Sequence, residues 1–379
     1  MSKSFLVLGG AGDMGSSVVD DLASNGVENL IVGDINEKSV VKTISRLKKK
    51  GVKAKGIKVD VNEKKELSAA IQEADVIVNT VGPFYKFETK ILDVVKDFDI
   101  GYVDICDDFD VTSDVFKKID TGSIKSRIVV GMGWTPGITN VCARDGYNNM
   151  DKVTEINIAW AGSAADAAGK AVIEHAFHVV TGDVPMFIEG KTRMVPARQF
   201  HREIEFPDPI NRVDTYYTGH PEPITIPIFL KGVETVTVRG TLIPDWQNNL
   251  VSQFADIGLT ENRLVEVGGR KVSSRDFLVS FVHDTLDQFK SGGVDKSGFW
   301  VEVKGKKNGK RVTIHYTGAD RMKRLTGIPA AIGAKFLSES NKVKRGIYAP
   351  EGAIDPSFFF NELRKRRIKV NKIVATEEF

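Results

Sequence analysis

A glycine-rich turn near the start of the chain constrains the fold more than any other feature. The apolar run Phe5-Leu6-Val7-Leu8 has the length and composition of a buried strand. It leads into Gly10-Ala11-Gly12-Asp13-Met14-Gly15, after which Val18 and Leu22 continue a helical spacing. A G-x-G-x-x-G turn between a buried strand and an amphipathic helix is typical of folds that bind a dinucleotide.

Each glycine of this turn has an expected task. Gly10 permits the tight turn, Gly12 lets backbone N–H groups approach a pyrophosphate, and Gly15 lets the helix pack close to the strand. The helix N-terminus, at Asp13 and Met14, supplies partial positive charge for the phosphates. We therefore expect these five residues to contact a dinucleotide cofactor. Gly9 adds one further glycine before the turn. The alternative is a glycine-rich connection that binds no ligand.

A carboxylate is expected about twenty residues after the turn, where the second strand ends. Asn29-Leu30-Ile31-Val32-Gly33 predicts that strand, and Asp34 follows it. The Asp34 carboxylate can accept hydrogen bonds from both ribose hydroxyls and would repel a 2′-phosphate, so the sequence favours NAD over NADP. Lys38 lies nearby and can soften that preference, and a helix-capping or loop role for Asp34 stays open. Asp60, at the end of the next expected strand, completes the cofactor contacts on this side.

The composition describes a globular chain and selects no class of macromolecular partner. The 379 residues are 41% hydrophobic and 27% charged, with a formal net charge of +3. The basic runs 48–50 and 364–367 lack the interleaved aromatic residues of a single-stranded nucleic-acid site, so we expect no nucleic-acid partner. No apolar run is long enough to span a bilayer, and we expect no signal peptide before the first strand. Cys106 and Cys142 form no metal-spaced or redox pair, which fits a cytoplasmic protein.

Strand and helix patterns alternate over the first third of the chain. Asn36 and Asn62 are expected to cap two of the helices. Besides the first two strands, apolar runs predict strands at 57–60, 75–81, 102–105 and 127–131. Six strands separated by helices predict a doubly wound, Rossmann-type parallel sheet of the α/β class over residues 1–145.

The pattern changes near residue 150. The strands become longer and alternate, and Asn308-Gly309 is a strong hairpin turn. Residues 146–324 therefore predict a substrate-binding and oligomerisation domain of the α+β class on a mixed, mostly antiparallel sheet. Residues 325–379 are expected to be helical and to return to the first domain, with Thr326 as a helix cap and Pro329 in the first turn.

Further candidate residues follow the strands of the first domain. Gly82, Pro83 and Tyr85 come after the fourth strand, at the sheet edge where cofactor and substrate meet in open α/β folds. We expect Gly82 and Pro83 to contact the cofactor and Tyr85 the substrate, with an ordinary turn as the alternative. Asp104, at the end of the fifth strand, can take a proton from a substrate amine, and the loop acids Asp107 and Asp108 follow it.

The turn after the sixth strand is a candidate for carboxylate binding. Thr135 as N-cap and Pro136 at the first helical position would begin a helix whose free N–H groups can hold a carboxylate. We expect Thr135 and Asn140 to contact the substrate. A plain connection between domains is the alternative.

The second domain contributes polar residues of its own. Prolines flank Glu222 in Gly219-His220-Pro221-Glu222-Pro223, so this segment is expected to be extended or turning rather than helical. His220 and Glu222 can then point the same way, to move a proton or bind the substrate, or they belong to a rigid loop with a satisfied histidine. Arg239, expected at the end of a strand of this domain, is a candidate partner for a substrate carboxylate. His175 and His178 lie beside Glu174, but no third ligand follows at metalloprotease spacing, so we predict no metal site.

The chain resembles the saccharopine dehydrogenase family. The resemblance lies in residues 7–15, Val78-Asn79-Thr80-Val81-Gly82-Pro83-Phe84, Tyr102-Val103-Asp104, residues 131–140 and Thr326-Gly327-Ile328-Pro329. It implies an NAD(P)-linked dehydrogenase that acts by hydride transfer on a C–N bond of an amino acid such as saccharopine or lysine, and a homodimer built through the second domain. Relatives that handle saccharopine tend to have Asp at the position of Thr135, so the resemblance supplies no catalytic acid there.

A substrate amine must be neutral before hydride leaves the adjoining carbon, so a base is needed. Asp104 is the first candidate for this catalytic base and His220 the second. Two other classes of protein fit the first domain: a sensor that binds NAD(H) without catalysis, and a dehydrogenase of alcohols or aldehydes. The absence of a Tyr-x-x-x-Lys pair after the fourth strand weakens the second of these, because Tyr85 is followed at that spacing by Thr89.

Overall fold

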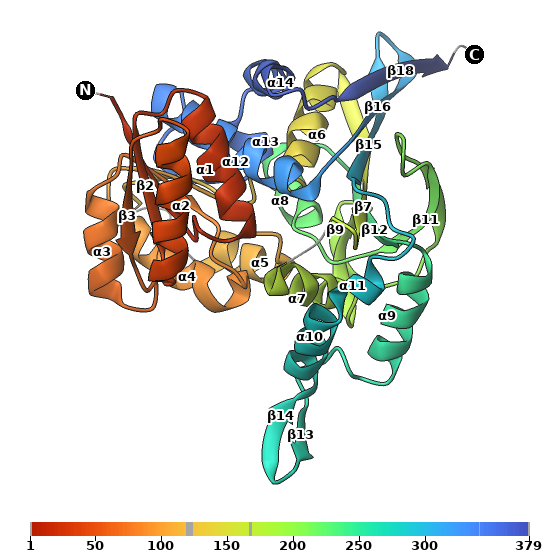
Figure 1. Ribbon diagram of the computed structural model, residues 1–379. Helices are drawn as coiled ribbons and strands as arrows, with labels where there is room; N and C mark the ends of the chain where they lie inside the picture. Colours follow the sequence, from red (N-terminus) through yellow and green to blue (C-terminus); the bar gives the residue numbers. More distant parts are fainter. Residues whose placement is uncertain (1, 119–123, 167–168, 341, 378–379) are drawn as a thin grey trace. The chain divides into compact units, whose positions relative to one another are not determined.

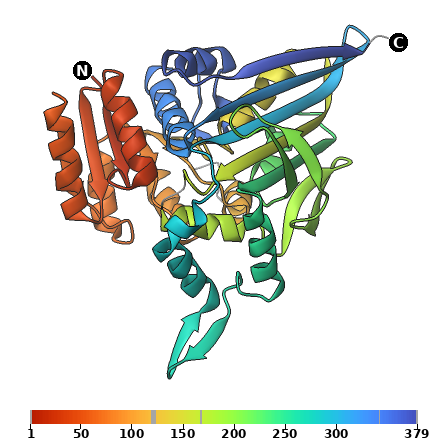
Figure 2. The same ribbon diagram turned by 45° about the vertical axis from the view of Figure 1, so that its right-hand side comes forward.

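The computed structural model describes residues 2–118, 124–166, 169–340 and 342–377. The chain divides into two compact units. The first contains residues 1–141 and 323–367, and the second contains residues 142–322 and 368–379. The expected boundaries, at 145/146 and 324/325, lie a few residues away. Both units are drawn in Figures 1 and 2.

The first unit is built on a seven-stranded parallel sheet with the strand order β17-β6-β5-β4-β1-β2-β3. In chain order its strands are β1 (Ser4–Leu8), β2 (Asn29–Asp34), β3 (Ala54–Lys58), β4 (Val76–Asn79), β5 (Gly101–Asp104), β6 (Arg127–Val129) and β17 (Gly346–Tyr348). The order of the first six strands is that of a Rossmann sheet, which confirms the predicted fold class. The seventh strand, β17, pairs in parallel with β6 and was not predicted.

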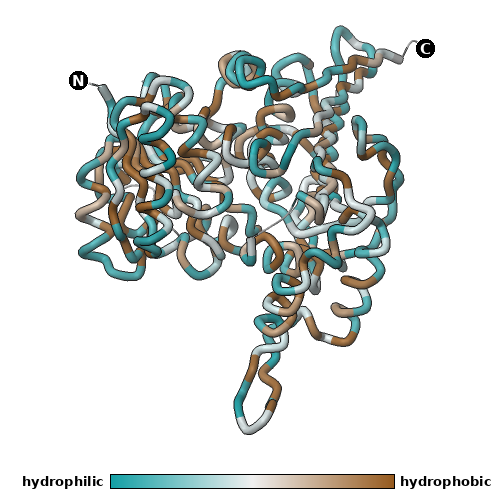
Figure 3. Tube along the Cα trace, in the orientation of Figure 1, coloured by the Kyte–Doolittle hydropathy of each residue, from teal (hydrophilic) through white to brown (hydrophobic). Residues whose placement is uncertain are grey.

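Helices cover both faces of this sheet. Its helices are α1 (Asp13–Ser24), α2 (Glu37–Lys49), α3 (Lys64–Gln72), α4 (Phe84–Val95), α5 (Phe109–Lys118), α12 (Met322–Glu339), α13 (Pro350–Ala353) and α14 (Pro356–Lys365). Helices α1, α2 and α12 lie on one face, and α4 lies on the other. Figure 3 shows the hydrophobic residues concentrated in the strands between them, where Leu6, Val32 and Val78 are fully buried.

Of the helix caps expected at Asn36 and Asn62, the structure confirms only the first. Asn36 caps α2 as expected, since its side chain accepts a hydrogen bond from the Ser39 N–H. The expected cap Asn62 is wrong by one residue, because Glu63 is the N-cap of α3. The Asn62 side chain instead bonds to Asp60 and Lys90.

The expected cap at Thr326 is also wrong. Helix α12 begins at Met322 and continues through Pro329. Its apolar face, which includes Leu325, Ile328 and Ile332, is buried. Packing of that face offsets the roughly 3 kcal/mol that a proline costs inside a helix.

The second unit is built on a mixed sheet with the main strand order β10-β11-β12-β7-β15-β16-β18, to which β8 and β9 add at β12. Its strands are β7 (Lys152–Ser163), β8 (Asp183–Ile188), β9 (Lys191–Pro196), β10 (Arg202–Glu205), β11 (Arg212–Tyr217), β12 (Thr235–Ile243), β15 (Ser297–Lys307), β16 (Lys310–Asp320) and β18 (Asn371–Glu377). Only the β12–β7 pair of this sheet is parallel among the described strands, so the sheet is mostly antiparallel, as predicted.

The Asn308-Gly309 turn joins β15 to β16 as predicted. Both residues have positive φ, which is the geometry of a two-residue hairpin turn that matches strand twist. The last strand, β18, pairs with β16, so the end of the tail is a strand rather than the expected helix. Figure 2 shows β15, β16 and β18 side by side.

Helices and a separate hairpin complete the second unit. Helix α6 (Ile138–Asn148) leads into it, and its other helices are α7 (Lys170–His178), α8 (Glu222–Phe229), α9 (Trp246–Asp256), α10 (Ser274–Asp284) and α11 (Leu286–Phe289). The hairpin of β13 (Leu264–Val267) and β14 (Arg270–Ser273) extends beyond α10 (Figure 1), and its Leu264, Val265 and Val267 are exposed. None of the helices in the described ranges is both long and apolar enough to cross a bilayer.

Candidate cofactor and active site

The glycine turn lies at the carboxyl end of β1, and β1 is flanked by β4 and β2. The strand order reverses between β1 and β4, which is where open α/β folds bind ligands. A Cβ atom on Gly15 would lie 2.1 Å from the Gly9 carbonyl oxygen, so α1 approaches the turn as closely as only glycine allows. Apart from its chain neighbours, a Cβ on Gly12 would meet only that same oxygen, at 3.2 Å, which leaves the outer side of Gly12 open.

The conformational role expected of Gly10 falls on its neighbour. Gly9 has φ +71°, in the left-handed region that favours glycine, whereas Gly10 is restricted by space, since its Cβ would lie 2.9 Å from the Val7 carbonyl oxygen. Helix α1 has no side-chain cap at its first turn. Its N-terminal N–H groups, at Asp13, Met14 and Gly15, therefore fit the phosphates of a dinucleotide.

Asp34 lies next to the glycine turn. Its carboxylate accepts hydrogen bonds from the Ala11 N–H at 3.2 Å and the Asn36 N–H at 3.0 Å. These bonds hold the carboxylate at the end of β2, where a ribose is expected. Asp60 follows β3, and its carboxylate accepts from the backbone and side-chain N–H groups of Asn62. The Asp60 side chain thus orders its own turn.

Thr80 supports the glycine turn from behind and was not predicted. Its hydroxyl donates to the Leu8 carbonyl oxygen at 2.8 Å, and the same hydroxyl would touch a Cβ on Gly9 or Gly15. Gly82 and Pro83, joined by a cis peptide bond, connect β4 to α4. Tyr85 lies in the first turn of α4 rather than in a loop, and its ring is partly exposed.

A buried polar network lies beneath the ends of β4 and β5. The Glu88 carboxylate, on α4, accepts from the Tyr102 hydroxyl at 2.8 Å and from the Asn79 amide at 2.9 Å. Burial, together with the nearby Asp104 charge, raises the pKa of Glu88 well above its usual range. Glu88 was not predicted, although the sequence contains one signal for it. It is an acid on the otherwise apolar face formed by Phe84, Ile91 and Val95.

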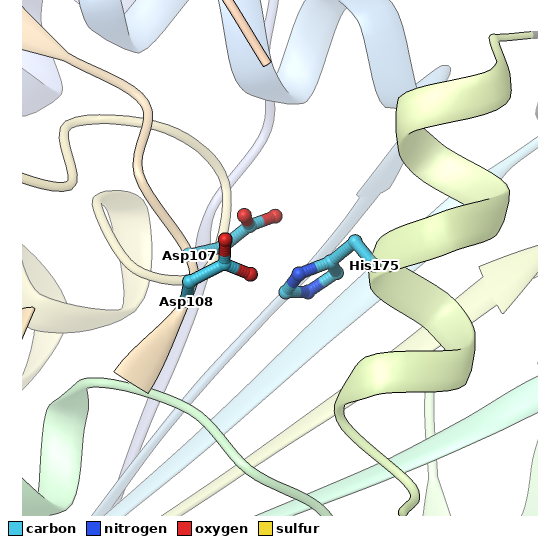
Figure 4. A group of neighbouring side chains, drawn as sticks. All are labelled: Asp107, Asp108 and His175. Atoms are coloured by element: carbon cyan, nitrogen blue, oxygen red, sulfur yellow. The ribbon is translucent and has the colours of Figure 1, made fainter. Parts of the chain in front are cut away.

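Asp104 is completely buried beside this network. Its Oδ1 accepts hydrogen bonds from the Cys106 N–H at 2.8 Å and the Gly131 N–H at 2.7 Å. Burial raises the pKa of Asp104 to about 6, while the two N–H groups oppose that rise. Oδ1 therefore joins the loops after β5 and β6, while Oδ2 is buried without a hydrogen-bond partner among the described residues. The expected role of Asp104 as a base stays a prediction. Asp107 and Asp108 follow in the next loop (Figure 4), and the Asp108 carboxylate accepts from the Tyr85 N–H at 3.1 Å.

The turn after β6 differs from the expected helix start. Helix α6 begins at Ile138, so Thr135 is not its N-cap and Pro136 is not its first residue. The N–H groups of Gly137, Ile138 and Thr139 already donate to the Asn140 side chain and to the Gly133 and Trp134 carbonyl oxygens. These donors are therefore not available to a substrate carboxylate. Thr135 and Asn140 are both buried, and their expected substrate contacts stay predictions.

In the second unit, His220 and Glu222 form a buried pair. Glu222 is the first residue of α8, with Pro221 as N-cap and Pro223 next, so the expectation of an extended segment is wrong. Proline is tolerated in a first helical turn because the N–H groups there have no helical partner. His220 Nδ1 lies 3.6 Å from Glu222 Oε2, within ion-pair reach but too long for a hydrogen bond. Side-chain exposure is 3% for His220 and 0% for Glu222.

Two rings lie against the imidazole of His220. The Trp160 ring lies 5.6 Å away and the His175 ring 5.5 Å away, centroid to centroid. His175 projects from the side of α7 (Figure 4). A pocket beside Trp160 is lined by residues that include Tyr216, Thr218 and Asn248. The Thr218 hydroxyl is buried there without a hydrogen-bond partner among the described residues.

Arg239 is separated from this group. It lies in the middle of β12, not at a strand end, and its guanidinium stacks on the Tyr217 ring at 4.4 Å. The neighbouring Gly240 faces Trp160, since a Cβ there would overlap the indole ring at 2.1 Å. Successive residues of a strand point to opposite faces. Arg239 therefore lies on the other side of the sheet from Trp160, and its expected contact with a substrate carboxylate stays a prediction.

Two family models match the chain over most of its length. The saccharopine dehydrogenase NADP binding domain matches residues 5–119, and the saccharopine dehydrogenase C-terminal domain matches residues 133–368. The chain belongs to the saccharopine dehydrogenase family. This membership agrees with the resemblance found in the glycine turn and the later motifs.

A solved structure shares the family fold along the whole chain. The apo histidine-tagged saccharopine dehydrogenase (L-Glu forming) from Saccharomyces cerevisiae aligns with a TM-score of 0.72 at 14% identity, covering 98% of this chain and 100% of that one. Among curated proteins, the (S)-acetoin-forming diacetyl reductases of two Staphylococcus epidermidis strains are 37% identical over 89 residues. That match covers 22% of this chain and 34% of theirs, so the chain spans about a third of the length of these relatives.

The family's cofactor is NAD(P), and the residues of the first unit fit it. The open side of Gly12, the uncapped first turn of α1 and the Asp34 carboxylate provide sites for the phosphates and the ribose. The protein is thus an NAD(P)-binding oxidoreductase of this family. The family description names NADP, whereas the position of Asp34 favours NAD on physical grounds.

Proposed function

We propose that this protein is a dehydrogenase that acts on the C–N bond of an amino acid, with saccharopine- or lysine-type compounds as the substrate class. Membership of the saccharopine dehydrogenase family over both units carries this proposal. In it, the first unit binds the dinucleotide and the second recognises the substrate and moves a proton.

The chemistry requires one hydride acceptor and one base. The glycine turn, the first turn of α1 and Asp34 would hold the dinucleotide, which would supply the acceptor for the hydride of the amine-bearing carbon. The substrate nitrogen must first give up a proton, and we assign its acceptance to His220. Water then adds to the C=N bond that results, and the C–N bond breaks to give a carbonyl compound and a free amine. The reverse sequence forms the C–N bond.

His220 suits this task better than Asp104. Its Nδ1 has no hydrogen-bond partner among the described residues, and Glu222 at 3.6 Å can stabilise the imidazolium that proton transfer creates. The Asp104 carboxylate also has a buried oxygen without a hydrogen-bond partner among the described residues, Oδ2, but its Oδ1 is held by two backbone N–H groups. The order of the two candidate bases is therefore reversed from the sequence-based expectation.

A homodimer built through the second unit is part of the same proposal. Exposed apolar side chains gather on the β13–β14 hairpin and α10, where Leu264, Val267, Phe277 and Phe281 are each at least half exposed. Burial of such side chains against a second copy would remove apolar area from water. Sedimentation equilibrium of the wild type and of Val267→Asp is the test. A dimeric mass that becomes monomeric in the variant is expected, and a monomeric wild type would contradict the dimer.

One substrate screen tests the catalytic proposal. Purified protein is incubated with NAD or NADP and with saccharopine, lysine, other amino acids and diamines, and formation of the reduced nicotinamide is followed by absorbance. Alcohols and aldehydes form the control panel. Reduction that depends on an amino-acid amine is expected. Tight binding of the dinucleotide without any turnover would indicate a sensor, and turnover confined to alcohols or aldehydes would indicate the other class of dehydrogenase.

A further inference from the structure

A lysine from the far end of the chain neutralises an acid in the glycine turn. Lys323 Nζ, at the start of α12, lies 2.7 Å from Asp13 Oδ1, at the start of α1. Both residues belong to the first unit, although 310 positions separate them. Both side chains keep roughly two fifths of their surface exposed, so the pair meets solvent beside the turn.

Close packing of the two helices fixes this pair. A Cβ on Gly327 would lie 2.6 Å from the Ser17 Cβ, so α12 and α1 touch through their backbones at this point. Gly327 is one turn beyond Lys323, and Ser17 is one turn beyond Asp13, so the helices run side by side in the same direction. The buried Arg366–Asp21 ion pair, at 2.8 Å, anchors α1 a further turn along. Lys323 is therefore held next to the turn.

The charge of Asp13 conflicts with the task of the turn. A carboxylate at the first position of a helix is favourable for the helix dipole, but a pyrophosphate binds at the same end because of the same dipole. Two anionic groups at one helix N-terminus repel each other. An adjacent ammonium group removes most of that repulsion.

We propose that Lys323 increases the affinity of the protein for its dinucleotide. By neutralising Asp13, it lets the glycine turn hold the pyrophosphate. The contribution of Lys323 to binding then depends on whether Asp13 is charged. This inference rests on the NAD(P) assignment and is independent of the amine chemistry proposed above.

Equilibrium binding to the full chain at low salt, monitored by nicotinamide fluorescence, tests the proposal. NADH and NADPH are first compared on the wild type, and the one that binds more tightly is then used for the variants. Lys323→Met is expected to raise Kd about tenfold, because it exposes the phosphates to an unscreened carboxylate. Asp13→Asn is expected to bind at least as tightly as the wild type. The double variant Asp13→Asn/Lys323→Met is expected to regain near-wild-type Kd, and Lys323→Arg to retain it.

Two comparisons isolate the phosphate effect. Lys96→Met removes one positive charge at the C-terminal end of α4, on the opposite edge of the sheet, and is expected to leave Kd unchanged. ADP is expected to lose affinity for Lys323→Met, whereas adenosine is not. Thermal unfolding of each variant checks that the fold is kept, since an exposed ion pair contributes only about 0–1 kcal/mol.

Three results would overturn the inference. Lys323→Met with wild-type Kd would show that the lysine is a surface group. A double variant as weak as Lys323→Met would show that the loss does not arise from Asp13. A wild type that binds neither dinucleotide would reject both the inference and the cofactor assignment. Binding of a dinucleotide without turnover in the substrate screen would reject only the proposed amine chemistry.

Discussion

The Asn140 amide donates a hydrogen bond of 2.8 Å to the Glu351 carboxylate, and the two side chains are almost completely buried. The other side of the same amide accepts from the Gly137 N–H. Asn140 thus joins the start of α6 to α13, within the first unit. We expect Glu351→Ala to lower the free energy of unfolding by about 1–3 kcal/mol, because it leaves a buried amide without its acceptor. Glu351→Gln keeps an acceptor and is the matched control in urea unfolding, and equal losses in the two variants would contradict this account.

Asp104→Asn separates a structural carboxylate from a catalytic one. The folded-state pKa is raised to about 6, above the roughly 4 of an exposed aspartate. The contribution of the protonated Asp104 carboxyl to the free energy of unfolding is therefore fully present below about pH 4. It decreases as the pH rises and is lost above about pH 6. Asparagine keeps an oxygen for the Cys106 and Gly131 N–H groups but cannot ionise. We expect the variant to match the wild type at low pH and to exceed its stability by up to roughly 3 kcal/mol above pH 6.

Turnover of the same variant decides the role of Asp104. If the carboxylate is structural, Asp104→Asn retains most of the activity with whichever amine the substrate screen identifies. Activity reduced by a hundredfold or more in a stably folded variant, roughly the size of a lost general base, would restore Asp104 as the catalytic base.

His220 and Glu222 are predicted to act together. His220→Asn removes the proposed proton acceptor and is expected to lower kcat by about a hundredfold or more. Glu222→Gln keeps the shape but not the charge, so we expect a smaller loss of kcat with little change in cofactor Kd. Steady-state kinetics and dinucleotide binding measured on the same samples check both points. Unchanged kcat in His220→Asn would remove the residue from the mechanism.

Gly15→Ala tests the closest contact in the cofactor site. The added methyl group would lie 2.1 Å from the Gly9 carbonyl oxygen and 2.7 Å from the Thr80 hydroxyl, so the turn or α1 must move. We expect dinucleotide binding to be lost, measured by fluorescence titration. Gly26→Ala is the control. It adds a methyl group beyond the far end of α1 that would meet no atom within 4 Å, so its only cost is the strain of a positive φ.

Asp34→Ala addresses the choice between NAD and NADP. Loss of the carboxylate removes the expected hydrogen bonds to the ribose hydroxyls and the repulsion of a 2′-phosphate. We expect NAD affinity to fall about tenfold while NADP affinity rises or stays level, as measured by isothermal titration. A wild type that prefers NADP strongly would contradict the role given to Asp34.

Local patterns predicted β1, β2, β4, β5 and β6 well because these strands are short, largely buried apolar runs followed by turns. The strand expected at 57–60 was displaced, because β3 spans Ala54–Lys58 and none of its side chains is fully buried. Local patterns failed where tertiary packing decides. The strand β17 is only three residues long and exists through its pairing with β6. Pro221 and Pro223 suggested an extended segment, yet both lie at the start of α8, where a proline removes no helical hydrogen bond.

The site showed the same division. The glycine turn and Asp34 could be predicted because their spacing along the chain reflects one strand–helix–strand unit. The contacts of Lys323 and Glu351 could not be predicted, because their partners Asp13 and Asn140 lie more than two hundred residues earlier in the chain and no local pattern links them. Arg239 was expected at the end of a strand but lies in the middle of β12, because local patterns do not fix where a strand ends. Its contact with a substrate stays a prediction.

The edge strand β17 has a consequence for how the protein is made. It closes the first sheet beside β6, but the ribosome reaches it only after the entire segment 142–322 of the second unit has been synthesised. Until then β6 is an open edge, with backbone N–H and C=O groups able to pair with another chain. The second unit waits in turn for β18, which follows residue 367. Neither unit can be completed before the other has been almost wholly translated, so the two mature together rather than in order along the chain.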